Sequence, residues 1–419
     1  MNGVDFKFGK GSAILLGLAL IAGVLVVWRF AGGLGTITNL NDGYAWGFWI
    51  GFDILAGIAL AAGGFVMAAV VYLFGNEKYH PLIRPAILTA FLGYLLFIVG
   101  LIIDLGRPWN IYHVIFHWQH HSAMFEVSWC VMCYTLVLAL EFVPNVFERF
   151  NWTTLTSLWR NLTPLLIIVL LTVFTAAMTH SVIWTVAAFL VLALFEIMVR
   201  TGAIRRDPQV PTLLIMAGVV LSTLHQSSLG TLFLVATAER LHPLYYSPLL
   251  PLMFLVSAVM VGPAMVMFES LAGARVFHRK PEMGLLSGLA KVMPWLLGIY
   301  ILIKLIELGV ANEFGLLFGS GSISAMFIIE MLLFLIPFFM FLSPGVRNSS
   351  SGLLWGSLFV AAGVVVNRLA VTYLAHTTAG HTYTPDPREI LVTIGLFSAG
   401  ILVFAFCAKY LPIFEEEAA

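Results

Sequence analysis

The chain has 419 residues, of which 60% are hydrophobic and only 10% are charged, and its formal net charge is zero. Soluble domains carry about a quarter charged residues, so this composition excludes an ordinary soluble protein and predicts an integral membrane protein with many spans. A neutral chain also lacks the basic surface that nucleic acid requires, and we expect no nucleic-acid partner.

Apolar runs long enough to cross a membrane recur along the whole chain. The first follows Lys7 and Lys10 and lacks a clean cleavage site, so it predicts an uncleaved span rather than a signal peptide. The run 162–199 is too long for one span, and we infer a tight hairpin at 179–181; without that pair the total is ten spans. The pattern predicts an all-α polytopic bundle, a single integral membrane domain over 1–419, with spans at 12–31, 44–74, 85–104, 122–145, 162–180, 182–199, 210–230, 247–269, 292–309, 322–343, 352–374 and 389–410.

Lysine and arginine are distributed unevenly between the two sets of loops. One set contains only Arg107, Arg240 and Arg388. By the positive-inside rule, the basic loops and both termini are expected in the cytoplasm. The basic set comprises Lys7, Lys10, Lys78, Arg84, Arg149, Arg160, Arg200, Arg205, Arg206, Arg275, Arg279, Lys280, Arg347 and Lys409.

The second run opens with two tryptophans and an aspartate. At 3.6 residues per turn, Trp46, Trp49 and Asp53 are expected on one face of a helix. A carboxylate inside a membrane is costly, so Asp53 indicates a functional site, with helix capping or pairing as the alternative. On another face, glycines at every fourth residue would let a neighbouring helix approach closely, and these are Gly43, Gly47 and Gly51.

The predicted orientation places several further polar residues at the level of that aspartate, in the outer half of the membrane. Asp104 and Arg107 follow the third span, and Glu126 lies about a turn into the fourth. His225 and Gln226 lie near the outer end of the seventh. The common depth follows from the topology, and convergence in one pocket is a hypothesis.

Such a pocket suits a quinone, because a flat ring stacks on aromatic walls while its carbonyl oxygens need hydrogen-bond donors. Reduction takes two protons, so we expect His225 as donor and Asp53 or Glu126 as proton relay. The same residues would serve a secondary transporter or ion channel. A passive anchor, in which the polar groups only hold helices together, is a further alternative.

Metal and haem are not favoured. No Asp, Glu or His pair has ligand spacing within one helix, and the cysteines Cys130, Cys133 and Cys407 form neither a disulfide framework nor a zinc ribbon. Haem needs axial ligands from facing helices, and only His180 and His225 lie within spans.

The outer stretch 111–121 is rich in histidine, and His113 and His117 are four residues apart, so they would ligate a metal if helical. An aromatic strip at the membrane interface is the commoner explanation. The stretch would also serve as a docking surface for an outer partner.

The second half has buried charges of its own. Lys304 and Glu307 are three residues apart in the ninth span, Glu330 lies in the tenth, and Arg368 lies in the eleventh. Two explanations stay open: ion pairs that tie helices together, or a proton path.

Several motifs, spread over nearly the whole length, resemble the NrfD/PsrC family (the polysulfide reductase membrane subunit family) and, within it, the HybB type found as the integral membrane subunit of hydrogenase-2. They are Trp-Gly-x-Trp-Ile-x-Phe-Asp at 46–53, Asp-x-Gly-Arg-x-Trp-Asn at 104–110, Phe-Glu at 125–126, His-Gln-Ser-Ser at 225–228 and His-Pro-Leu at 242–244. The stretch 162–206 departs from the pattern and indicates an extra hairpin.

The resemblance implies a subunit without haem or iron–sulfur cluster that exchanges electrons with menaquinone near the outer face. It implies two four-helix bundles, at 44–145 with 210–230 and at 247–410. The implied partners are a periplasmic ferredoxin-like iron–sulfur subunit and a hydrogenase, a molybdopterin-type enzyme or a multihaem cytochrome c.

The resemblance also implies residue roles. Family positions place the quinone site around Asp53, Asp104–Arg107 and His225, with Tyr94 and Glu126 on a proton route from the cytoplasm. Such a route would couple quinone chemistry to proton movement across the membrane. By itself the subunit would not be catalytic.

Overall fold

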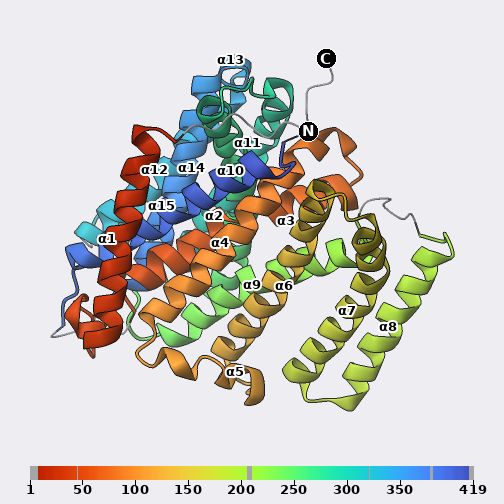
Figure 1. Cartoon of the computed structure of the whole chain (residues 1–419). Helices are drawn as coiled ribbons and strands as arrows, with labels where there is room; N and C mark the ends of the chain where they lie inside the picture. Colours follow the sequence, from red (N-terminus) through yellow and green to blue (C-terminus); the bar gives the residue numbers. More distant parts are fainter. Residues whose placement is uncertain (1–7, 45, 205–209, 320, 378–380, 415–419) are drawn as a thin grey trace.

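A computed structural model describes residues 8–44, 46–204, 210–319, 321–377 and 381–414. Within these ranges the regular secondary structure is helical, with two isolated β-bridges and no strand, which confirms the predicted all-α class. The same ranges contain twelve helices that are long and apolar enough to cross a membrane. Figure 1 shows these helices packed side by side as one polytopic bundle.

The long helices follow the apolar runs, because backbone groups in lipid must find their hydrogen bonds within the helix. Two short helices, α5 (His113–Phe116) and α13 (Pro344–Arg347), lie in connections between spans. The long helices are α1 (Lys10–Gly32), α4 (Ile83–Asp104), α6 (Ala123–Arg149), α7 (Thr153–Thr179), α8 (Val182–Arg200), α9 (Thr212–Ala236), α10 (Leu250–Val276), α11 (Met283–Val310), α12 (Ser322–Leu342), α14 (Ser350–Leu369) and α15 (Pro387–Tyr410).

The second span is irregular. It joins η2 (Ile50–Ala56), α2 (Gly57–Leu60), α3 (Gly63–Ala68) and η3 (Ala69–Leu73), and both η2 and η3 are π-helical. Trp46 lies in the loop before this span, so the prediction that Trp46, Trp49 and Asp53 share one helix face was wrong.

The predicted glycine face is also wrong, since only one of its three glycines lies in the span. A Cβ at Gly43 would lie 2.5 Å from the Cβ of His381, and one at Gly47 would meet the hydroxyl of Tyr383. These two glycines therefore let a loop approach the 381–383 segment. Gly51 alone serves helix packing, with a Cβ there lying 3.0 Å from Leu369.

The predicted hairpin is confirmed. Helices α7 and α8 are joined by a tight turn in which His180 adopts the left-handed conformation, with φ of 47°. The pair packs together at the edge of the bundle, where Figure 1 shows it projecting from α6 and α9. The structure therefore has the extra pair of spans inferred from the length of the 162–199 run.

Helix α9 lies at the centre of the packing, between α6 and α10, and α10 also contacts α11 and α14. The last helix, α15, packs against α1 and α4. The division into a bundle at 44–145 with 210–230 and a second at 247–410 stays a prediction, since α15 and α10 connect the two sets.

The bundle has two ends that differ in charge. We call one the basic end, because the helix termini there carry Arg84, Arg149, Arg200 and Arg347. The opposite end carries α5 and the connecting segments 33–44 with 46–47, 237–249 and 375–377 with 381–386, and Figure 1 shows α5 and α13 at the two extremes. That the basic end faces the cytoplasm stays a prediction.

Candidate functional site

Three carboxylates lie close together at the opposite end, between η2, α4 and α15. Asp53 is only 6% exposed, and Thr393 donates a hydrogen bond of 2.8 Å to one of its oxygens. The other oxygen has no partner in the described part of the chain. Asp104 interacts electrostatically with Asp53 and with Glu389 of α15. We call Asp53, Asp104 and Glu389 the acid cluster.

Arg29 provides the positive charge of this region. It is 3% exposed, its Nε donates to the carbonyl oxygen of Ile103 at 2.6 Å, and its guanidinium also donates to that of Leu105. These carbonyls end α4, where a cation is favoured by the helix dipole, and Arg29 also faces Asp104 electrostatically. Sequence reasoning missed Arg29, although an arginine within an apolar run was a visible signal.

Glu389 organises the loops over the acid cluster. One of its oxygens accepts hydrogen bonds of 3.0 Å from the backbone N–H groups of Asn39 and Asp386, and the other accepts from the hydroxyl of Tyr383. The indole of Trp49 donates to the Glu389 carbonyl at 3.0 Å. Trp49, Asp53 and Asp104 therefore lie around Glu389, which sequence reasoning missed.

His225 lies in a separate cluster formed by α4, α6 and α9. Its ring centroid is 5.7 Å from that of Tyr94 and 6.3 Å from that of Phe97, and Tyr94 stacks edge-on against Tyr134 at 4.8 Å. The hydroxyl of Tyr94 is buried without a hydrogen-bond partner among the described residues, and the buried ring of His225 faces the backbone of Val127. Buried polar groups are costly when unpaired, so this cluster suits protons or a ligand.

Gln226 is buried beside the histidine. Its side-chain nitrogen donates to the carbonyl of Ile58 at 3.3 Å, and its oxygen has no partner within the described ranges. The amide therefore attaches α9 to the second span and leaves one acceptor free.

The predicted convergence is only partly present. Helix α4 connects the two clusters, because Phe97 contacts His225 while a Cβ at Gly100 would lie 3.4 Å from that of Asp53. Arg107 is exposed in the loop after α4, and Glu126 is half-buried in the first turn of α6. Arg107 follows the end of α4, and Glu126 interacts electrostatically with Cys130 on the same helix, which lies near Tyr94.

A cavity of about 500 Å³ opens at the opposite end, where α9 ends. Trp46 lies in its wall and packs against Phe233, with ring centroids 5.1 Å apart. Val235, near the C-terminal end of α9, is 69% exposed, so this part of the rim is accessible. We call this the aromatic cavity; it is lined by Gly43, Tyr44, Trp46, Val235, Ala236, Thr237, Ala238, Glu239, Arg240 and His376.

Two hydrogen-bonding groups reach this cavity from loops. Arg240 donates to the carbonyl of Gly43 at 3.4 Å, and a ring nitrogen of His376 lies 3.1 Å from the carbonyl of Val371. Burial, opposed by the carbonyl of Val371 and assisted by the charge of Arg240, lowers the pKa of His376. Neither residue was predicted for the site, because only the fold brings 240 and 376 together.

The predicted charges of the second half form one network. Lys304 pairs with Glu307 at 3.3 Å, and Glu330 accepts hydrogen bonds from Tyr300 at 3.2 Å and Asn367 at 3.0 Å. Lys304 also interacts electrostatically with Glu330. Lysine, carboxylates and tyrosine thus form a buried polar line through α11, α12 and α14.

Arg368 extends this network toward α10. It donates to Asn367 and to Ser257, at 2.7 Å each, and its guanidinium lies 3.6 Å from the ring centroid of Phe254. Phe254 in turn stacks near Phe233, which packs on Trp46. The geometry is compatible with both explanations, helix-tying pairs and a proton path.

The described residues contain no group of three or more His, Cys, Asp or Glu side chains that would hold a metal ion. His113 and His117 stack on each other, with ring centroids 5.0 Å apart, on the exposed helix α5. Phe116 beside them is 73% exposed, which is compatible with an interfacial strip or a docking surface.

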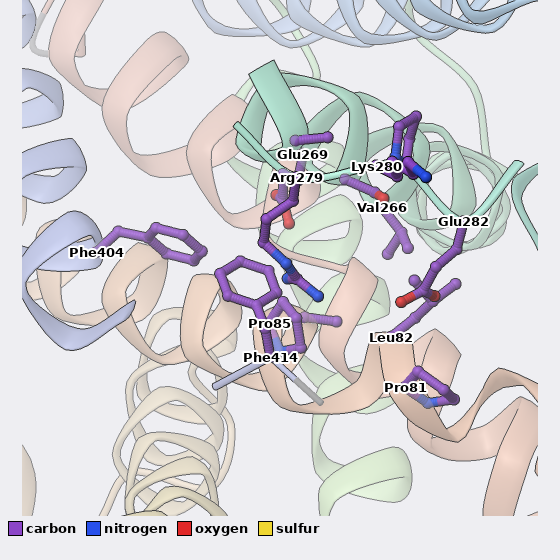
Figure 2. Close-up of a pocket in the computed structure, with 14 residues that line it drawn as sticks. Pro81, Leu82, Pro85, Val266, Glu269, Arg279, Lys280, Glu282, Phe404 and Phe414 are labelled. Atoms are coloured by element: carbon purple, nitrogen blue, oxygen red, sulfur yellow. The ribbon is translucent and has the colours of Figure 1, made fainter. Parts of the chain in front are cut away.

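A smaller cavity, of about 40 Å³, lies at the basic end (Figure 2). Its wall includes Glu269 and Arg279, whose guanidinium lies 4.2 Å from the ring centroid of Phe414. Figure 2 shows Phe404 and Phe414 on one side of it and Glu282 on the other. It is too far from the aromatic cavity to form part of the same site.

The fold defines a polytopic helical membrane protein with buried polar groups, and comparison with known proteins identifies its family. The family model described as "Polysulphide reductase, NrfD" matches residues 36–380. This chain therefore belongs to the NrfD family, as its motifs indicated.

Three relatives cover almost the whole chain. A protein of Nitratidesulfovibrio vulgaris is 37% identical over 96% of this chain and 94% of its own length. The probable Ni/Fe-hydrogenase 2 b-type cytochrome subunit of Escherichia coli is 32% identical over 94% of this chain and 90% of its own. The menaquinone reductase integral membrane subunit of N. vulgaris is 26% identical over 94% and 90%.

The name of the E. coli relative raises the question of haem. A haem in a membrane bundle commonly takes two axial ligands from facing helices. The rings that contact His225 among the described residues are those of Tyr94 and Phe97, and no second histidine faces it. This arrangement does not fit bis-histidine ligation, and the absence of haem stays a prediction.

Proposed function

We propose that this chain is the quinone-reactive integral subunit of a respiratory oxidoreductase complex and passes electrons between a partner at the opposite end and menaquinone. The observation that carries the proposal is the aromatic cavity at the end of α9. The relatives of this chain include the integral membrane subunit of a menaquinone reductase and a probable Ni/Fe-hydrogenase 2 b-type cytochrome subunit, and both are compatible with this role.

The cavity has the composition that a quinone ring requires. Tyr44 and Trp46 offer aromatic faces, and the guanidinium of Arg240 offers hydrogen-bond donors for a carbonyl oxygen. A volume of about 500 Å³ lies within the usual range for small-molecule sites. The exposed rim at Val235 gives an isoprenoid tail a way into lipid.

Reduction of a quinone adds two electrons and two protons, so the side chains that protonate the ring must themselves receive protons. We assign this role to the groups beneath the cavity: the acid cluster on one side of α4, and His225, Gln226 and Tyr94 on the other. Both lie toward the opposite end, and both contain buried oxygen or nitrogen atoms without a partner in the described part of the chain.

Protons for these groups would come from the basic end. Tyr94 and Glu126, together with the buried network of Lys304, Glu307, Glu330 and Arg368, provide titratable side chains inside the bundle. Movement of protons along them would make quinone turnover contribute to the membrane potential. The proposal thus includes coupling of quinone turnover to proton movement across the membrane.

The partner is proposed to be a periplasmic ferredoxin-like iron–sulfur subunit, connected to a hydrogenase, a molybdopterin-type enzyme or a multihaem cytochrome c. The exposed α5 strip at the opposite end offers it a surface. This assignment places the chain in the bacterial inner membrane with both termini in the cytoplasm.

The test uses the complex purified with this subunit and a water-soluble menaquinone analogue. We expect Trp46→Ala and Arg240→Gln each to raise KM for the analogue about tenfold, because a charged hydrogen bond or a stacking face is worth roughly 1.4 kcal/mol or more. Control variants are Trp355→Ala, on an exposed part of α14, and Arg347→Gln at the basic end.

Unchanged kinetics in both cavity variants would remove the aromatic cavity from the mechanism. Proteoliposomes separate the other functions: a transporter would move solute without a redox donor, and a passive anchor would lose assembly in these variants with no separate quinone phenotype.

A further inference from the structure

The α7–α8 hairpin carries a cavity of its own at the basic end. It has a volume of about 120 Å³ and lies where α7, α8 and the start of α9 meet. This is roughly four times the ~30 Å³ that one water molecule takes in the liquid, which is room for a phosphate group. It is lined by Arg160, Asn161, Pro164, Glu196, Val199, Arg200, Pro211 and Thr212.

The side chains of this cavity give it a net positive charge. Glu196 is buried and is neutralised by Arg200, whose Nε lies 2.7 Å from its carboxylate oxygen. The Arg200 side chain remains 49% exposed, so the rest of its guanidinium is accessible. Arg160, across the cavity on α7, is exposed and has no ion pair among the described residues. Within the described ranges, one arginine without an ion pair and one arginine with part of its guanidinium accessible therefore line the same cavity.

The start of α9 adds donors to this charge. The first hydrogen bonds of the helix run from the N–H groups of Leu214 and Ile215 to the carbonyl of Pro211, so the N–H of Thr212 precedes them. The helix has no side-chain cap, and Pro211 and Thr212 at its N-terminus, the positive end of its dipole, line the cavity. The hydroxyl oxygen of Thr212 is itself buried without a hydrogen-bond partner.

The surface below the cavity is apolar and exposed. Leu165 on α7, one turn deeper than Asn161, is 51% exposed, and Leu194 on α8, one turn deeper than Met198, is 58% exposed. Helix α8 packs mainly against α7, and Figure 1 shows the hairpin at the edge of the bundle. A positively charged cavity lies directly above exposed leucines. This arrangement matches a phospholipid, whose anionic headgroup would occupy the cavity and whose acyl chains would contact the leucines.

We propose that this cavity binds the headgroup phosphate of an anionic phospholipid, with Arg160, Arg200 and the N-terminus of α9 around the phosphate and the acyl chains along α7 and α8. Basic pockets between helices at a membrane surface are a known way to hold such headgroups. The bound lipid would tie the weakly packed hairpin to α9. This inference is independent of the quinone site.

The experiment is native mass spectrometry of the full chain in mild detergent, supplied with equal amounts of phosphatidylglycerol and phosphatidylcholine. We expect the wild type to retain phosphatidylglycerol preferentially. Arg160→Gln should reduce that retention about fivefold, since a basic residue near the surface contributes about this much. Arg160 is exposed, so this change does not threaten folding.

Thr212→Asp is a second, sharper variant. An aspartate in the first turn of a helix favours the helix, so α9 should form normally, but its carboxylate would occupy the cavity and repel phosphate. We expect retention to fall to the level of phosphatidylcholine. Arg347→Gln, which removes a charge elsewhere at the basic end, is the matched control and should leave retention unchanged.

Equal retention of phosphatidylglycerol in wild type, Arg160→Gln and Thr212→Asp would overturn the proposal. So would complete displacement of the lipid by millimolar inorganic phosphate, which would show a site for a free anion. Loss of retention when the partner subunits are bound would indicate that a protein, and not lipid, covers the hairpin, and would also overturn it.

Discussion

Single buried residues decide where this membrane protein holds charge. Arg29 is surrounded by apolar helices, yet it is satisfied by the carbonyls that end α4 and by its proximity to Asp104. Arg368 donates to Asn367 and Ser257, but its Nε is buried without a partner among the described residues. The hydroxyl of Tyr94 is also buried without a partner in the described part of the chain. A satisfied charge such as Arg29 indicates a structural role, and a buried polar atom without a partner indicates a place for chemistry.

His376 gives a prediction at this scale. Burial lowers its pKa below the ordinary 6.5, so the folded protein prefers the neutral ring. Between the lowered pKa and 6.5 the unfolded chain binds more protons, so stability is present above 6.5 and is lost as pH falls below it. Thermal unfolding midpoints between pH 5 and 8 should fall more steeply for the wild type than for His376→Gln.

The comparison with His376→Gln isolates this residue from other histidines. Burial also lowers the pKa of His242, so the wild-type profile alone would not identify the source. Parallel profiles for the two proteins would contradict the prediction.

At the scale of elements, the second span shows how irregular helices form a site. Asp53 lies in the π-helical segment η2. Gly51 of the same segment approaches Thr372 in another π-helical segment, η7 (Ala370–Leu374), which follows α14. A π-helical turn inserts a residue and redirects the side chains after it, and such turns are frequent at functional sites. The irregularity therefore aims Asp53 at α4 and α15.

Helix α9 offers a second test, because it touches α10 at a glycine. A Cβ at Gly230 would lie 2.5 Å from the Cα of Pro251 and 2.6 Å from the carbonyl oxygen of Leu250. These are backbone atoms, so the clash cannot be relieved by rotating a side chain and the two helices would have to move apart. We expect Gly230→Ala to lower the free energy of unfolding by about 1–3 kcal/mol, measured by thermal or denaturant unfolding in detergent.

Gly17→Ala is the matched control, since a Cβ there would have nothing within 4 Å. An exposed helix interior gains up to about 1 kcal/mol from this change. A stable Gly230→Ala protein would show that α9 and α10 lie farther apart than described.

At the scale of the whole molecule, an even number of spans returns the chain to the side where it began. The basic end should face the cytoplasm by the positive-inside rule. We predict that Asp42→Cys, at the opposite end, reacts with a membrane-impermeant maleimide in intact spheroplasts. Gly345→Cys, at the basic end, should react only after permeabilisation. Both positions are exposed.

The reverse labelling pattern would show that the molecule has the opposite orientation, with the aromatic cavity on the cytoplasmic side. It would then contradict a periplasmic partner, while leaving the cavity itself intact. Labelling of the apolar-run cysteine Cys130 would be a sign of unfolding, since it is fully buried.

Much of the fold was predictable because lipid leaves a chain few choices. Apolar length determined the spans, including the α7–α8 pair inferred only from the length of 162–199, and buried charges marked Asp53 and Glu330 as special. The grouping of Trp46 with Trp49 was wrong, because local periodicity cannot show where a glycine-containing loop ends and a helix begins.

The sequence by itself determined the class, the spans and the family of this protein, since hydropathy and local motifs act over a few turns. The tertiary structure alone decided the site: it set Arg29 and Glu389 around the predicted aspartates, left Arg107 outside, and joined Arg240 to His376 across 135 intervening positions in the chain. Those contacts depend on how helices far apart in sequence pack, and no spacing within one helix encodes that.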